Sequence, residues 1–182
     1  MARGAVLLAV SASVAIHRAL DVASELRKRG TPLRVMMTVA ATQLISPLQF
    51  QAVSGAPVFH DIFATGGGDA YEHLTVAREA SVFVAAPATA DFIARLAAGM
   101  ANDAPSTAAL AFSGQRVFCP AMNWRMWDHP FTQRNAAVLE AAGWQRIGPE
   151  RGELGCGEEG PGRLASVDCI LAGIDAALAK AH

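Results

Sequence analysis

The sequence predicts an α/β fold: a single doubly wound, mostly parallel sheet flanked by helices, of the flavodoxin or Rossmann-like type. Two observations predict it. Short apolar runs without polar alternation, such as residues 5–10 and 81–87, are typical of parallel strands buried on both faces. These runs alternate with stretches of helical periodicity, beginning with a strand-helix-strand unit over residues 5–38. The 182 residues are expected to form one domain, 1–182.

The predicted elements follow one another along the chain with short connections. Strands are expected at residues 5–10, 33–38, 58–63, 81–87, 115–118 and 144–147. Helices are expected at residues 14–29, 40–44, 47–53, 73–80, 91–98, 103–112, 131–142 and 166–181. Residues 148–163 hold six glycines and two prolines. We therefore expect a mobile flap or lid at about residues 148–166.

Composition limits the classes of function. Hydrophobic residues make up 52% of the chain and charged residues 17%, which fits a buried sheet together with a subunit interface. The net charge of −1 gives no electrostatic basis for binding nucleic acid or an anionic membrane. No apolar run approaches the roughly 18 residues of a membrane span, and the apolar start is interpreted as a strand, so we expect a cytoplasmic protein. The three cysteines are widely spaced, which predicts reduced thiols and neither a disulfide framework nor a metal site.

The most unusual segment is residues 119–130, which follow the apolar end of a predicted strand. Between Pro120 and Pro130 it holds two Trp, two Met, an Asn, an Arg and a His. The prolines argue against a continuous core helix, and the side chains are not those of a solvated loop. The segment is therefore either the wall of a pocket for a flat or apolar ligand, or a loop packed into the core or a subunit interface.

Hydroxyl side chains follow the first two predicted strands. Ser11 and Ser13 lie in a turn of small residues before the first helix, and Thr38 ends the second strand. Small hydroxyl residues at a helix start allow a phosphate to approach backbone N–H groups. The turn does not form GxGxxG, so a dinucleotide site is not predicted, and as an isolated signal for phosphate the turn is weak.

Residues 120–127, Pro-Ala-Met-Asn-Trp-Arg-Met-Trp, resemble the PxMNxxMW motif of the homo-oligomeric flavin-containing cysteine decarboxylases. That family includes the phosphopantothenoylcysteine decarboxylases and the peptidyl-cysteine decarboxylases. Other segments resemble the family in the same order, namely residues 45–55, 73–80, 87–91 and 155–163. The resemblance spans about residues 5–166 and includes the predicted flap.

The resemblance implies FMN as the cofactor, bound between the subunits of a homotrimer or of a dodecamer built from trimers. The residues that it implies in cofactor binding are Ser11, Ser13 and Thr38 near the phosphate, and Thr89, Ser106 and Thr107 near the ring.

The resemblance also implies a reaction, the oxidative decarboxylation of a terminal cysteine. Hydride transfer to flavin creates the electron sink that lets CO2 leave, and an ene-thiol results. His73 would be the base at the reacting cysteine, and Asn123 would hold the substrate carboxylate. Met126 would shape the site, Cys156 would act from the flap, and Arg125 either binds substrate or pairs across a subunit interface. The other histidines, which we interpret as structural or solvated, are His17, His60, His129 and His182.

The substrate stays open between phosphopantothenoylcysteine and the C-terminal Cys of a ribosomally made peptide. The turn at Ala12 and Ser13 is similar to that of peptide enzymes, and the expected stand-alone chain, without a fused ligase domain, points the same way. Cys156 instead matches the thiol with which coenzyme A enzymes reduce the ene-thiol. Asp91 departs from the Asn of the family's PASANT motif. The alternatives to a decarboxylase are a non-catalytic flavin-binding regulatory protein and a prenylated-flavin synthase of a related fold.

Overall fold

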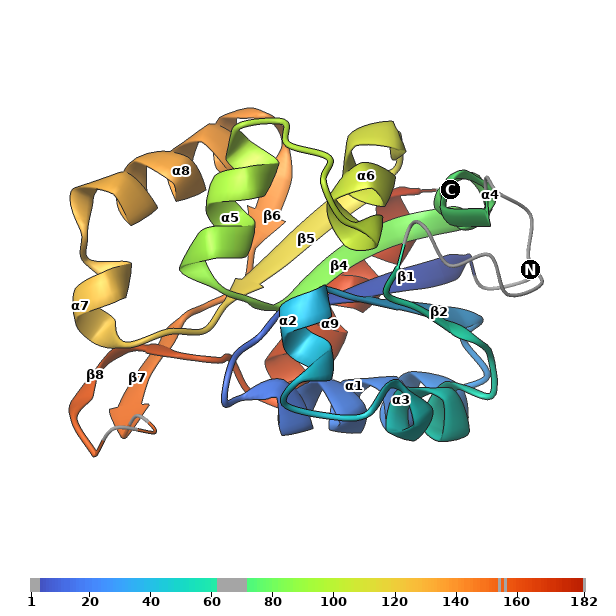
Figure 1. The fold of residues 1–182 in the computed structure, drawn as a ribbon, viewed down its shortest axis with the longest axis horizontal. Coiled ribbons are helices and arrows are strands. Elements are labelled where there is room, and N and C mark those ends of the chain that lie inside the picture. Colours follow the sequence, from blue (N-terminus) through green and yellow to red (C-terminus); the bar gives the residue numbers. More distant parts are fainter. Residues whose placement is uncertain (1–3, 62–71, 154, 156, 182) are drawn as a thin grey trace.

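The computed structural model describes residues 4–61, 72–153, 155 and 157–181, and for residues 72 and 73 it describes the backbone alone. Six parallel strands form one sheet in the order β3-β2-β1-β4-β5-β6 (Figure 1). The strands are β1 (Ala5–Val10), β2 (Leu33–Met37), β3 (Val58–Phe59), β4 (Ala80–Ala88), β5 (Gln115–Pro120) and β6 (Trp144–Arg146). The predicted doubly wound α/β fold is confirmed, and within the described residues this sheet is parallel throughout.

Helices cover both faces of the sheet (Figure 1). One layer consists of α1 (Ile16–Lys28), α3 (Pro47–Ser54) and α9 (Val167–Lys180). The opposite layer consists of α4 (Glu72–Glu79), α5 (Ala90–Ala97), α6 (Ala104–Ala111) and α8 (Pro130–Ala141). Two single-turn helices, α2 (Val39–Thr42) and α7 (Trp124–Trp127), follow the carboxyl ends of β2 and β5.

The core explains why the strands lack polar alternation. In β1, Leu8 and Val10 pack in the layer with α1 and α9, whereas Leu7 and Ala9 pack in the layer with α5, α6 and α8. All four side chains are fully buried. A strand between two helical layers needs apolar residues at every position, because neither of its faces meets water.

The structure differs from the sequence-based expectations in three segments. The expected strand at 58–63 is only Val58–Phe59, and residues 62 and 63 lie outside the described part of the chain. The segment after β5 was expected to be irregular, but it contains α7. The expected flap forms an antiparallel hairpin of β7 (Glu150–Glu153) and β8 (Glu159–Arg163). Glycine and proline disfavour strands, but packing of β8 against α7 overrides that preference. No helix in the described part of the chain has both the length and the apolar character that a membrane crossing requires.

Candidate active site at the carboxyl edge of the sheet

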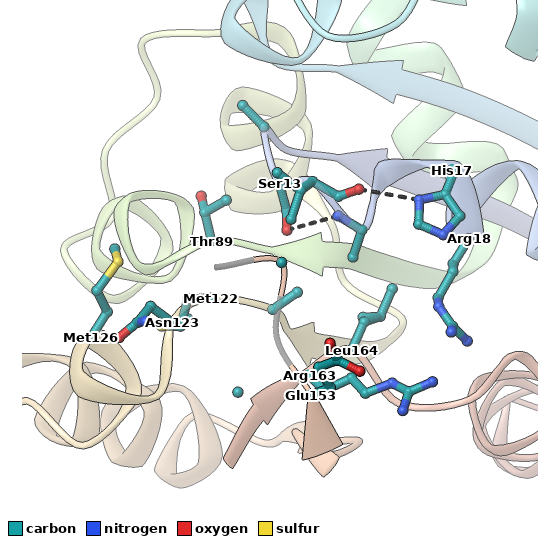
Figure 2. A pocket seen from close by; sticks show the side chains of 16 residues that line it. Ser13, His17, Arg18, Thr89, Met122, Asn123, Met126, Glu153, Arg163 and Leu164 are labelled. Carbon is teal, nitrogen blue, oxygen red and sulfur yellow. Dashed lines mark hydrogen bonds between the residues drawn. The ribbon is translucent and has the colours of Figure 1, made fainter. Parts of the chain in front are cut away.

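A cavity of about 740 Å³ lies beyond the carboxyl ends of β1, β4 and β5 (Figure 2). The described lining residues are 12–15, 17 and 18 around the start of α1, Thr89, residues 121–123 and 126 after β5, and residues 153, 155 and 162–164 in and just after the hairpin. The strand order reverses between β1 and β4, because β1, β2 and β3 form one half of the sheet and β4, β5 and β6 form the other. Open α/β sheets bind ligands at such a switch point, and the volume is in the range of small-molecule sites.

The turn between β1 and α1 brings the start of a 13-residue helix to the cavity. Ala12 and Ala15 line the cavity with little side chain, so the backbone of the turn is accessible to a ligand. The Ser13 hydroxyl lines the same wall and accepts a hydrogen bond from the Ala15 N–H at 3.3 Å. The partial positive charge at the start of α1 suits an anionic group such as a phosphate.

Ser11 has a different position from Ser13. Its side chain is buried, donates to the Pro87 carbonyl oxygen at 2.7 Å and accepts from the Thr89 N–H at 2.9 Å. It thus joins the ends of the two central strands, and it is not among the described residues that line the cavity. A direct contact between Ser11 and a cofactor stays a prediction.

The other predicted cofactor residues divide into two groups. Thr89 lines the cavity, and its hydroxyl oxygen caps α5 by accepting from the Phe92 N–H at 3.2 Å. Thr38 caps α2 through the Ala41 N–H at 3.1 Å, and Ser106 belongs to the capping box of α6. The hydroxyl of Thr107 is buried without a hydrogen-bond partner in the described part of the chain. The described cavity lining includes none of Thr38, Ser106 and Thr107.

Asn123 is both a cavity residue and the N-cap of α7. Its Oδ1 accepts from the Arg125 N–H at 2.9 Å, and its Nδ2 donates to the Glu158 carboxylate at 3.0 Å. A backbone N–H needs an acceptor and a carboxylate needs a donor, so these two partners determine which end of the amide is oxygen. The nitrogen end is therefore the end that faces the Glu158 carboxylate.

The other residues of segment 119–130 are divided between the two predicted positions, the wall of a pocket and the core. Met122 and Met126 line the cavity as a pocket wall. Trp127, in contrast, is buried in the core with Phe118 and other residues of its layer. Arg125 is 71% exposed, with its guanidinium 3.5 Å from Glu158 and above the ring of Trp124. It pairs within the chain, and its binding of substrate stays a prediction.

The hairpin is docked against α7, and Figure 1 shows the two side by side. The Met122 N–H donates to the Gly162 carbonyl oxygen at 2.9 Å. A Cβ at Gly160 would lie 2.6 Å from Cβ of Trp124, and a Cβ at Gly162 would overlap the Met122 carbonyl oxygen. Close packing therefore requires glycine at positions 160 and 162.

Four cavity residues with charged or imidazole side chains were not assigned to the site from the sequence: His17 and Arg18 on α1, and Glu153 and Arg163 on the hairpin. Figure 2 shows Arg18 and Arg163 on the side of the cavity away from Asn123 and Met126. The cavity thus has an end with an amide and thioethers and an end with two guanidinium groups and the Glu153 carboxylate. His17 was expected to be structural or solvated; it is exposed and lines the cavity.

The other side chains assigned by resemblance fall partly outside the described residues. His73 is the second residue of α4, but only its backbone is described, and Cys156 lies outside the described residues. His129 caps α8 by accepting from the Phe131 N–H at 3.3 Å, which is a structural role as expected.

Comparison with known proteins identifies the family. Residues 2–179 match the model of the family named Flavoprotein. The chain belongs to the Flavoprotein family. A probable phosphopantothenoylcysteine decarboxylase of Streptococcus mutans is 38% identical to this flavoprotein over 172 residues, which are 93% of this chain and 96% of the relative.

Two further relatives extend the comparison of this flavoprotein. The coenzyme A biosynthesis bifunctional protein CoaBC of Escherichia coli is 42% identical over 159 residues, which are 87% of this chain and 39% of the relative. The chain therefore spans about two fifths of that bifunctional protein. The crystal structure of the FMN-dependent cysteine decarboxylase SpaF is similar with a TM-score of 0.84 and 31% identity, covering 99% of this chain and 98% of SpaF. The resemblance to flavin-containing cysteine decarboxylases is confirmed.

Proposed function

We propose that this flavoprotein is an FMN-dependent decarboxylase of phosphopantothenoylcysteine, which it converts to the ene-thiol. The observation that carries the proposal is the polarity of the cavity, with the oriented Asn123 amide at one end and Arg18 and Arg163 at the other. The substrate has a carboxylate at one end and a phosphate at the other. Support also comes from the name and extent of the Streptococcus mutans relative, whose length this chain matches almost completely.

The described residues fit a flavin nucleotide. The first turn of α1, with Ala12, Ser13 and Ala15, would hold the phosphate, because a helix start with small side chains suits an anion. Thr89 and the thioether of Met122 would contact the flat ring from the cavity wall. The Thr107 hydroxyl lies outside the described cavity lining, but it has no hydrogen-bond partner among the described residues and would be able to bond to a ligand there. FMN, when bound, supplies the acceptor for a hydride from the thiol-bearing carbon.

The chain's own residues would bind and orient the substrate. Nδ2 of Asn123 would donate to the carboxylate without forming an ion pair, so the departure of CO2 would not be opposed by the loss of one. His73, at the start of α4, would accept the proton released at the reacting cysteine. Met126 would form an apolar wall beside the carboxylate. We propose that Cys156 would act from the flap segment as the proton donor when the ene-thiol is reduced, and the hydride for that step would come from the reduced flavin.

The guanidinium groups distinguish between the two candidate substrates. Within the described residues, neither Arg18 nor Arg163 has an ion-pair partner, and both line the cavity. Cations of this kind bind phosphate by bidentate hydrogen bonds. A peptide carries no obligatory anion at that distance from its terminal cysteine. The peptide reading is therefore the second candidate, favoured by the first turn at Ala12 and Ser13.

A homotrimer, or a dodecamer built from trimers, is the proposed assembly. Large apolar side chains are exposed near the cavity and along the following helices, and these are Val14, Val39, Leu44 and Leu48. Exposed apolar side chains of this number support contact with a second subunit. Light scattering after size-exclusion chromatography measures the assembly. The proposed activity, a step of coenzyme A synthesis, would place the protein in the cytoplasm.

One experiment tests the activity. The purified yellow protein is incubated with phosphopantothenoylcysteine and, separately, with peptides that end in cysteine, and the products are analysed by mass spectrometry. Loss of CO2 and two hydrogens identifies the ene-thiol, and loss of CO2 alone identifies decarboxylation followed by reduction. If flavin is bound and no cysteine substrate loses CO2, the decarboxylase proposal fails and the regulatory alternative is favoured. His73→Asn should keep flavin and abolish turnover.

A further inference from the structure

The hairpin brings a carboxylate and a guanidinium to the same part of the cavity. Glu153 ends β7 and Arg163 ends β8, and both residues line the cavity. A Cβ at Gly152 would lie 3.1 Å from Nη1 and 3.2 Å from Cδ of Arg163. The side chain of Arg163 therefore extends over Gly152, which immediately precedes Glu153.

Glu153 belongs to the basic end of the cavity. Figure 2 shows it beside Arg163, on the side toward Arg18 and away from Asn123. Glu153 is exposed, and among the described residues its carboxylate has no ion-pair partner. Its oxygens are therefore open to a ligand in the cavity.

The three charged groups at this end place two demands on a ligand. Arg18 and Arg163 suit a phosphate, which carries nearly two negative charges at neutral pH. An ionised carboxylate repels phosphate oxygens, and it accepts hydrogen bonds but donates none. Glu153 therefore needs a neutral donor that lies a short distance from the phosphate.

Phosphopantothenoylcysteine has such a donor in its pantoyl unit. The hydroxyl of that unit is separated from the phosphate ester by a short branched carbon chain. The amide N–H groups follow further along the molecule, in the direction of the cysteine. When the phosphate is bound by Arg18 and Arg163, the hydroxyl is therefore the donor nearest to the basic end of the cavity.

We propose that Glu153 is a specificity-determining residue for the pantoyl unit: its carboxylate accepts a hydrogen bond from the pantoyl hydroxyl while Arg18 and Arg163 bind the phosphate. The inference rests on the proposed decarboxylase function and deepens it, since it assigns recognition of the middle of the substrate to the hairpin. A peptide that ends in cysteine carries no obligatory hydroxyl at this position, so the contact favours the phosphopantothenoyl substrate.

Two other roles for Glu153 lead to different results. If its carboxylate oriented the neighbouring guanidinium, its removal would weaken the binding of phosphorylated substrates alone. If it mainly repelled phosphate, its removal would strengthen their binding. Neither role makes binding depend on the pantoyl hydroxyl. The absence of an ion pair between Glu153 and Arg163, both of them described residues, favours a contact with the ligand.

The test compares KM for pantothenoylcysteine with KM for its deoxy analogue, in which hydrogen replaces the pantoyl hydroxyl. Neither compound has a phosphate, so repulsion between Glu153 and phosphate does not enter the comparison. In the FMN-loaded wild type, loss of the hydroxyl should raise KM about tenfold, because a charge-assisted hydrogen bond is lost. In Glu153→Ala the two KM values should agree within about twofold, since the partner of the hydroxyl is absent. Glu153→Gln keeps a neutral acceptor oxygen, so its ratio should be about threefold.

The matched control is Glu159→Gln. Glu159 is opposite Glu153 in the register of the hairpin, is exposed, and has its carboxylate 3.9 Å from the Arg151 guanidinium. This variant should keep the ratio of the wild type. Because each ratio is measured within one variant, general damage to the site affects both KM values alike. The proposal is overturned if Glu153→Ala keeps the preference of the wild type for the hydroxyl, or if the wild type has none.

Binding provides a second readout, independent of turnover. Phosphopantetheine has the pantoyl hydroxyl but no carboxylate, so it binds without being decarboxylated. Calorimetry should show that the wild type and Glu159→Gln bind it about tenfold more tightly than its deoxy analogue. Glu153→Ala should bind the two ligands equally. If Glu153→Ala instead alters only the discrimination between phosphorylated and unphosphorylated ligands, Glu153 acts on the guanidinium groups and the proposal fails.

Failure of the inference and failure of the proposed function are distinguishable. If the wild-type protein decarboxylates no cysteine substrate, the proposed function fails, and calorimetry still tests the contact with the hydroxyl. If the wild type is active and Glu153→Ala behaves like Glu159→Gln, only the role of Glu153 is refuted. Flavin absorbance and the thermal unfolding midpoint of each variant show whether it has folded.

Discussion

The hydroxyl oxygen of Ser11 accepts a hydrogen bond of 2.9 Å from the backbone N–H of Thr89, which is 78 positions further along the chain. The same hydroxyl donates to the Pro87 carbonyl oxygen at 2.7 Å. One buried side chain therefore fixes the end of β1 against the end of β4. The turn before α1 and the start of α5 both adjoin this junction.

Ser11→Ala should destabilise the protein and reduce its flavin content. The Thr89 N–H would lose its acceptor in a buried position, which costs about 1–3 kcal/mol. For a chain of this size, that loss corresponds to a fall of roughly 2–10 °C in the unfolding midpoint. Circular dichroism measures the midpoint, and Thr42→Ala, whose hydroxyl bonds Val39 at an exposed site, is the control. An unchanged midpoint would contradict the assigned role of Ser11.

Gly162→Ala should release the hairpin without unfolding the sheet. An alanine there has no room for its Cβ beside the Met122 carbonyl oxygen, and φ is +148°. Gly157→Ala is the matched control, because φ is also positive, at +80°, but the new Cβ meets no atom within 4 Å. Trypsin should cut at the exposed Arg163 faster in Gly162→Ala than in the wild type or the control. Equal rates in all three would mean that close packing does not hold the hairpin.

The stability of the protein should depend on Cys119 at alkaline pH. Burial raises the pKa of this thiol from its usual value of 9.0. Above pH 9.0 the unfolded thiol loses its proton while the folded thiol keeps it. The contribution of Cys119 to stability is thus complete below that pH and is lost as the pH rises, by up to about 1.4 kcal/mol per pH unit.

Urea unfolding between about pH 8 and pH 11 measures this dependence. Cys119→Ala should flatten the decline of the unfolding free energy with pH, even if it lowers stability at every pH. Cys169→Ala, at an exposed position, should leave the decline as in the wild type. The prediction fails if the wild type and Cys119→Ala decline equally.

Arg18→Gln should weaken binding of the phosphorylated substrate selectively. Arg18 lies at the basic end of the cavity, so its loss removes a charge-assisted contact worth about 1.5–3 kcal/mol, or roughly tenfold to 150-fold in KM. KM for pantothenoylcysteine, which lacks the phosphate, should change little. Arg27→Gln, on the same helix but outside the cavity lining, is the control. Equal effects on both substrates would place the phosphate elsewhere.

The sheet was predictable because its signal is local. Each strand of the core is a short apolar run, and burial on both faces is sufficient to explain that pattern. The predicted helix ends were also close to the observed ones, because residues such as Ser46 and Ser166 cap α3 and α9, as expected for serine. The hairpin was not predictable, because β8 gains its position from contact with Trp124 and Met122, far away in the sequence.

Residues of the site could be predicted from the sequence only where they belong to a recognisable motif. Met122 and Met126 belong to the segment for which a pocket wall was one of two interpretations, and both line the cavity; Met126 lies in α7, and Met122 immediately precedes its N-cap. The same spacing separates Val14, in the turn before α1, from Arg18 on α1, and could have indicated that Arg18 faces the site. The pairing of Asn123 with Glu158 had no such signal, since it joins residues 35 positions apart through the docked hairpin.

The position of Asn123 at the start of α7 limits how this protein can be engineered. An Asp, Ser or Thr would cap the helix but offer the ligand no amide donor. A Gln would keep the donor, but N-caps favour the shorter side chains of Asn, Asp, Ser and Thr. Asn meets both requirements at this position, because it is a preferred N-cap residue and its side chain offers the ligand an amide donor. A library that varies substrate preference should therefore keep position 123 constant and change the opposite wall of the cavity.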